Sequence, residues 1–190
     1  MFQVRIHGRG GQGVVTGAEM LALAAFLEGR HSQAFPSFGS ERMGAPVVSF
    51  CRIAENEIRL REPVMAPDAL IVQDPTLLHQ VDLFGGLSKS GYILINSGKS
   101  LEELGLYGLP YPEDHLLTFP ATEIALQHIG RPLPNSSLLG GFCALTGKVG
   151  IDSLKKAIGM KFPGRTGADN IAAAETSYDI VMEKMHASAD

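Results

Sequence analysis

Short runs of alternating apolar residues and longer stretches with helical spacing succeed one another along the chain. Residues 2–7 carry apolar side chains at every second position, which is the pattern of a strand with one buried face. Residues 14–28 place theirs at the three- and four-residue spacing of a helix, and Gly29 follows where a C-terminal cap is expected. The beginning of the chain therefore predicts a strand, a glycine-rich loop and a helix in succession.

The same kind of pattern continues to the C-terminus. Further strands are predicted at residues 32–35, 47–53, 69–73, 92–95 and 116–119. Helices are predicted at residues 120–129, 134–148, 151–158 and 167–185. We expect residues 57–61 to form a strand that pairs with residues 47–53 as a small hairpin insertion. Alternating strands and helices indicate an α/β fold, with a Rossmann-like, mostly parallel sheet and helices on both faces.

Composition narrows the class of protein. The 190 residues fit one domain, which we take as residues 1–190, and 45% of them are hydrophobic. The net charge of −4 argues against broad nucleic-acid binding. The first residues lack the pattern of a signal peptide, and no apolar run is long enough for a membrane helix. We therefore expect a cytoplasmic protein that does not bind a membrane.

The residues that most often carry metal and redox chemistry are few. Cys51 and Cys143 lie far apart, so we expect two reduced thiols, and two cysteines cannot supply the four thiolates of an ordinary iron–sulfur cluster. None of the six histidines stands in a metal-ligand spacing. No catalytic nucleophile or acid–base pair can be singled out. We predict no metal site and no complete active site in this chain.

The loop HGRGGQG, residues 7–13, is the first candidate for a ligand site. Its glycines have the spacing of a nucleotide-binding loop, and it has the required strand before it and helix after it. Glycines allow backbone amides to approach a phosphate closely, and the positive end of the helix dipole adds to the attraction. Arg9 supplies a possible further charge. A glycine-rich loop of this kind also serves as a simple packing turn, so both interpretations stay open at this point.

The surrounding sequence disfavours the usual ligands of such a loop. An NAD site needs an acidic residue at the end of the second strand, about 20 residues further on. The segment HSQAFPSFGS, residues 31–40, contains none, and the first acid is Glu41. No Gly-Lys-Ser or Gly-Lys-Thr follows the loop, which excludes a Walker-type phosphate site.

Several other loops are expected to share one edge of the sheet with the glycine loop. In open α/β sheets, ligands bind outside the carboxyl ends of the strands. The loops predicted there are residues 8–13, 36–46, 73–76, 96–99 and 118–122. Asp74 in this rim either caps the following helix or touches a ligand, and Asn135 is expected to cap the helix that begins near it.

The segment AFPSFGSERMGAPV, residues 34–47, is the second unusual stretch. Its glycines and prolines predict a loop of fixed shape. Phe35, Phe38 and Met43 are too apolar for a loop that only faces water. The segment is more typical of a partner surface or the wall of a ligand site.

Four segments together resemble a known family. GRGGQGVVTGAEMLA, AFPSFGSERMGAPV, VQDPTLL and PNSSLLG are similar to the gamma subunits of pyruvate:ferredoxin oxidoreductases, of the 2-oxoacid:ferredoxin oxidoreductase family. The resemblance implies a subunit of an enzyme that oxidatively decarboxylates a 2-oxo acid to acyl-CoA and CO2 and passes electrons to ferredoxin. It also implies that thiamine diphosphate, Mg and the iron–sulfur clusters are bound by partner subunits of the alpha, beta and delta types.

The resemblance and the predicted rim together suggest a role in binding coenzyme A at the subunit interface. Coenzyme A carries phosphates that backbone amides and basic side chains recognise. The candidate residues are Gly8, Arg9, Gly10, Gly11, Gln12, Gly13, Ser37, Arg42, Asn96 and Lys99. Two alternatives are a free-standing nucleotide-binding oxidoreductase and a subunit with a purely structural role in assembly.

Overall fold

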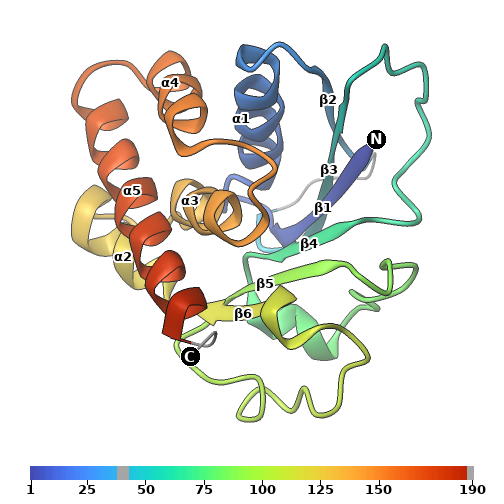
Figure 1. Cartoon of the computed structure of the whole chain (residues 1–190). Coiled ribbons are helices and arrows are strands. Elements are labelled where there is room, and N and C mark those ends of the chain that lie inside the picture. The colour runs from blue at the N-terminus through green and yellow to red at the C-terminus, as the bar shows by residue number, and fades with distance from the viewer. Residues whose placement is uncertain (38–42, 188–190) are drawn as a thin grey trace.

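A six-stranded sheet with the strand order β2-β3-β1-β4-β5-β6 organises the fold (Figure 1). It is seen in a computed structural model that describes residues 1–37 and 43–187. The strands are β1 (Phe2–Arg9), β2 (His31–Pro36), β3 (Pro46–Ala54), β4 (Ala69–Val72), β5 (Tyr92–Asn96) and β6 (Leu116–Phe119). Strand β3 runs antiparallel to both β1 and β2, whereas β1, β4, β5 and β6 pair in parallel. The α/β class and the mostly parallel sheet are confirmed.

The α-helices gather on one face of this sheet. They are α1 (Val14–Leu27), α2 (Ala121–Ile129), α3 (Asn135–Thr146), α4 (Ile151–Lys161) and α5 (Gly164–Ala187). All of them pack into one hydrophobic core with alternate residues of the strands, such as Ile71 and Leu94. In Figure 1 these helices lie together on one side of the strands.

The opposite face of the sheet has a different cover. Leu70, Val72 and Ile93 point away from the helices and form a second apolar cluster. The 3-10 helix η1 (Pro75–His79) and irregular segments between residues 81 and 111 contribute the other side of this cluster. A second 3-10 helix, η2 (Glu113–His115), leads into β6. The sequence predicted helices on both faces of the sheet. The structure has α-helices on one face and a 3-10 helix with irregular segments on the other.

The hairpin is built from different strands than the sequence predicted. Residues 57–61 are not a strand. Strand β3 lies between β1 and β2, so both of its edges are already paired and no position remains for another partner. The antiparallel hairpin is formed by β2 and β3, with Phe35 opposite Phe50 in its register. Ser37 extends this pairing, and residues 43–45 lead into β3 beside Gly10.

Candidate functional site

The loop between β1 and α1 has a backbone that requires glycine at two positions. Gly11 and Gly13 have φ angles of 94° and 74°, in the region that side chains disfavour. A Cβ atom on Gly13 would also lie 2.7 Å from Nδ2 of Asn135. The sequence predicted Asn135 as the N-cap of α3. This prediction is wrong, because Pro134 takes that position. The Asn135 side chain packs against Gly13 instead, so the N-termini of α1 and α3 meet at this contact.

The N-terminus of α1 has no side-chain cap among residues 1–37 and 43–187. The first helical hydrogen bond runs from the amide of Gly17 to the carbonyl of Gly13 at 2.8 Å. The amides of Val14, Val15 and Thr16 precede it, and no side chain among the described residues caps them. These three residues line a hollow of about 320 Å³ together with Arg9, Gly10, Gly11, Gly13 and Val47. The hollow thus lies at the start of α1, directly beside the glycine loop.

Other donors of the glycine loop are used within the protein. The Gly10 amide donates to the Ala45 carbonyl at 2.9 Å, and the Gln12 amide donates to the Arg9 carbonyl at 3.0 Å. The Arg9 amide donates to Oε1 of Gln12 at 2.8 Å. The amides of Arg9, Gly10 and Gln12, three of the candidate residues, are therefore not available to a ligand.

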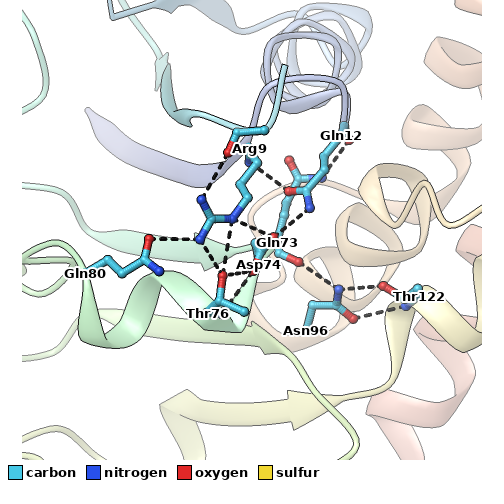
Figure 2. Close-up of polar contacts among 9 residues, drawn as sticks. Arg9, Gln12, Gln73, Asp74, Thr76, Gln80, Asn96 and Thr122 are labelled. Atoms are coloured by element: carbon cyan, nitrogen blue, oxygen red, sulfur yellow. Dashed lines mark hydrogen bonds and ion pairs between the residues drawn. The ribbon is translucent and has the colours of Figure 1, made fainter. Parts of the chain in front are cut away.

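The guanidinium of Arg9 points toward η1, as Figure 2 shows. Its Nε lies 3.2 Å from Oδ2 of Asp74, and its Nη2 donates to Thr76 at 2.6 Å and to Gln80 at 2.9 Å. Its Nη1 donates to the carbonyl of Gly44 at 3.0 Å. Arg9 thus joins the glycine loop both to η1 and to the segment that precedes β3.

Asp74 is the acceptor at the centre of this network. It caps η1 by accepting hydrogen bonds from the amide of Thr76 at 3.0 Å and from its hydroxyl at 2.6 Å, which confirms the capping interpretation. Gln12 Nε2 donates to its other oxygen at 2.8 Å. Burial alone would raise the pKa of Asp74. The hydrogen bonds from Thr76 and Gln12 and the charge of Arg9 outweigh burial and lower the pKa, so the carboxylate stays charged.

A second hollow, of about 420 Å³, opens on the other side of the glycine loop. Its wall is made of Gly10, Gly11, Gln12, Met43, Gln73, Asp74, Pro75, Asn96, Thr122, Pro132, Leu133 and Pro134. The predicted rim is confirmed here, since residues from all five predicted loops meet at one hollow. The segment 132–134 was missed, because nothing in its sequence indicates that it folds back over the sheet edge.

Asn96 holds two of the rim loops together and is 8% exposed. Its Nδ2 donates to the Gln73 carbonyl at 2.8 Å and to the Thr122 hydroxyl at 2.7 Å, and its Oδ1 accepts from the Thr122 amide at 3.0 Å (Figure 2). Asn96 therefore positions the wall of the hollow, and its own polar atoms are already engaged.

The remaining candidate residues lie apart. The Ser37 amide donates to the Val48 carbonyl at 2.9 Å and so extends the β2–β3 pairing. Lys99 is exposed, and neither Ser37 nor Lys99 lines the two hollows at the glycine loop. Gly8 is buried, and a Cβ atom there would lie 2.6 Å from Val14. Arg42 falls outside the described residues.

Titratable groups near the site are few. His7 leads into the loop, and burial, with a smaller effect of Arg5, lowers its pKa to about 4. Cys51 and Cys143 are free thiols buried in the helical core. No group of three or more potential metal ligands occurs in residues 1–37 and 43–187. Across the same ranges, no helix has the length and hydropathy needed to cross a membrane.

Comparison with known proteins identifies the family to which this chain belongs. The family described as pyruvate ferredoxin/flavodoxin oxidoreductase matches residues 3–180. Pyruvate synthase subunit PorC of Methanothermobacter marburgensis is 47% identical over 179 residues, which cover 94% of this chain and 97% of the relative. The common gamma subunit of the pyruvate/ketoisovalerate oxidoreductases of Pyrococcus furiosus is 46% identical, covering 94% and 96% of the two chains.

A solved structure agrees with these relatives. The pyruvate oxidoreductase subunit PORC of Thermotoga maritima superimposes with a TM-score of 0.81 at 37% identity, over 94% of this chain and 95% of that one. The chain therefore belongs to the pyruvate ferredoxin/flavodoxin oxidoreductase family, in which it is a gamma-type subunit of a 2-oxoacid:ferredoxin oxidoreductase.

Proposed function

We propose that this subunit covers the active-site interface of the assembled oxidoreductase and holds the phosphate groups of coenzyme A there. The observation that carries the proposal is the uncapped first turn of α1, whose residues line the hollow beside Val47. Backbone N–H groups at a helix N-terminus bind anions through direct hydrogen bonds and through the helix dipole. Acidic side chains are absent from the first turn of α1.

The network around Arg9 gives the loop a defined shape in this proposal. Arg9 shares its charge with Asp74 and so is not the main phosphate ligand. Its contacts with Thr76 and Gly44 hold the loop in place, which reduces the entropy lost when a ligand binds. The subunit thus contributes a rigid set of backbone donors.

The rest of the reaction is assigned to other chains. We propose that thiamine diphosphate, Mg and the iron–sulfur clusters are bound by alpha-, beta- and delta-type partners, and that ferredoxin accepts the electrons. Support comes from the relatives, which are themselves described as subunits. The two cysteines of this chain are buried, and they are too few to hold a cluster.

The proposal is tested by placing a negative charge in the first turn of α1. Thr16 lines the hollow and is partly exposed. In the assembled complex, we expect Thr16→Glu to raise the KM for coenzyme A about tenfold or more, because a carboxylate there competes with phosphate for the same donors. The KM for the 2-oxo acid should stay unchanged.

Thr16→Gln is the matched control, since glutamine has the shape of glutamate without its charge. We expect its KM for coenzyme A to stay within about threefold of the wild-type value. Equal KM values in the two variants would contradict phosphate binding at α1 and would favour a purely structural role in assembly.

A further inference from the structure

Strand β2 lies at one end of the sheet and leaves a backbone edge unpaired (Figure 1). The Ser37 amide donates to the carbonyl of Val48, which lies opposite Ser37 when the register of β2 with β3 is continued. Hydrogen-bonded pairs alternate along an antiparallel ladder, so the amides and carbonyls of Ser32 and Ala34 point away from β3. These backbone groups have no hydrogen-bond partner within residues 1–37 and 43–187.

The edge of β2 lacks the usual protection against an added strand. Sheets commonly protect an end strand with charged side chains, proline or a covering group. The six residues of β2, HSQAFP, include no Asp, Glu, Lys or Arg, and the proline stands at the last position. At the other end of the sheet, Lys184 of α5 donates from its Nζ to the Thr118 carbonyl of β6 at 2.9 Å. The end at β2 is therefore the one suited to receive a further strand.

A hollow of about 530 Å³ lies beside β2, on the sheet face away from the α-helices. Ala34 packs against the helical core, so its neighbours Gln33 and Phe35 point to the opposite face. These two side chains line the hollow together with Glu57, Ile58, Arg59 and Arg61 of the connection that follows β3. A strand added to β2 would therefore direct every second side chain toward this hollow.

Arg52 lies behind Gln33 and Phe35 as a buried cation whose close partners are all uncharged. It is 1% exposed, and its guanidinium donates to Oε1 of Gln3 at 3.0 Å, to Oε1 of Gln33 at 3.3 Å and to the Glu62 carbonyl at 2.6 Å. No ion pair in residues 1–37 and 43–187 includes Arg52. The carboxylate of Glu62 acts on it only over a longer distance, and burial still lowers the pKa of the guanidinium. A buried charge without a paired opposite charge is costly, so a carboxylate nearby is favourable.

The exposed charges at the hollow have the same sign in excess. Arg59 pairs with Glu57 at 3.0 Å, whereas Arg61 forms no ion pair with any described residue. This excess of positive charge occurs on a chain whose net charge is −4. An acidic side chain from another protein complements it. A second copy of the same edge does not, because pairing two β2 strands would bring the arginines of both copies together.

We propose that the outer edge of β2 pairs with an extended segment of a neighbouring subunit of the oxidoreductase, and that this segment places an acidic side chain in the hollow beside Arg61. Backbone hydrogen bonds to Ser32 and Ala34 supply affinity in this arrangement, and alternate side chains supply specificity. Phe35 and Ile58 give the same segment apolar contacts. The pairing does not depend on coenzyme A, so it stands or falls separately from the proposed function.

Hydrogen exchange of the assembled complex, compared with the isolated subunit, tests the backbone pairing. We expect the amides of Ser32 and Ala34 to exchange at least about a hundredfold more slowly in the complex, because each gains an acceptor. Equal exchange rates in the two samples would overturn the proposal. Protection that is already present in the isolated subunit and is lost on dilution would also overturn it, since a second copy of the chain would then cover the edge.

Arg61→Glu tests the acidic character of the partner segment. We expect the Kd for association of the subunit with the complex that lacks it to rise at least about tenfold, because two like charges then meet in the hollow. Arg165→Glu is the matched control, with the same change of charge on a side chain of α5 that is 93% exposed, and its Kd should stay within about twofold of the wild-type value. Added salt should weaken the wild type more than Arg61→Glu. Equal Kd values for the wild type and Arg61→Glu would overturn the proposal even if the β2 amides are protected.

Discussion

The guanidinium Nε of Arg9 lies 3.2 Å from Oδ2 of Asp74 and joins the end of β1 to the start of η1. The two residues are distant in sequence, but Arg9 ends β1 and Asp74 follows β4, the adjacent parallel strand. Their side chains are 22% and 13% exposed, so water screens the pair less than it would screen a surface ion pair. The ion pair therefore attaches the glycine loop to the segment that follows β4.

Arg9→Ala should therefore destabilise the subunit by about 1–3 kcal/mol, because it leaves Asp74 and the Gly44 carbonyl with fewer partners. Urea titration of the subunit measures the loss. Arg59→Ala is the control: Arg59 pairs with Glu57 at a site where both side chains are well exposed, and we expect almost no change. Equal effects of the two substitutions would show that the Arg9 network adds no stability.

His7 predicts a pH dependence of folding. Its pKa is about 4 in the folded chain against an ordinary value of 6.5, so the unfolded chain binds the proton more tightly. Stability should fall by up to about 3 kcal/mol as the pH drops from 6.5 to 4. His7→Gln should flatten this part of the curve, whereas His186→Gln, at an exposed position, should leave it as in the wild type. A wild-type curve already flat over this range would rule out the burial of a neutral His7.

Gly13→Ala tests the junction of α1 with α3. We expect a loss of about 2–4 kcal/mol in the free energy of unfolding, because the change combines backbone strain with a collision against Asn135. Gly29→Ala is the matched control: Gly29 has a similar φ of 82° with nothing within 4 Å, so only the strain of about 1 kcal/mol remains. Adding Asn135→Ala to Gly13→Ala should restore part of the difference. No restoration would mean that the collision is not what destabilises the variant.

The two thiols should be unreactive in the folded subunit. Burial raises the pKa of Cys51 to about 12, and it raises that of Cys143 further. Iodoacetamide at pH 8 should therefore label neither residue until urea unfolds the chain, because the thiolate is the reactive form. Mass spectrometry of the intact subunit gives the count of labels. Rapid labelling without urea would contradict the burial of these thiols.

Much of the fold could be predicted from local patterns, and the exception shows their limit. The segment 57–61 alternates charged residues with Ile58 and Leu60, which is typical of a strand. A strand also needs a free edge to pair with, and β3 has none because β1 and β2 occupy both sides. Strand pairing is decided by residues far apart in sequence, so a local pattern cannot supply it.

The site was predictable as a region more than as a set of contacts. The rim followed from the rule that ligands bind at the carboxyl ends of parallel strands, and Asn96 and Gln12 do lie there. The roles of their side chains depend on the register of β1 with β4, which sequence spacing does not reveal. Gln73 lies in the predicted rim loop 73–76, but its position in the sequence does not show that its Nε2 donates to the Gln12 carbonyl.

The insertion of β3 between β1 and β2 has a consequence for how the chain tolerates change. A parallel strand after β2 would have needed a crossover helix, which would carry the chain away from the rim. The antiparallel return instead lays residues 43–45 along the glycine loop, where Gly10 exchanges hydrogen bonds with Gly44 and Ala45. Residues 43–45 are thereby tied to the β2–β3 ladder on one side and to the glycine loop on the other. Added or lost residues there should be rarer among relatives than at the tips of the other surface loops.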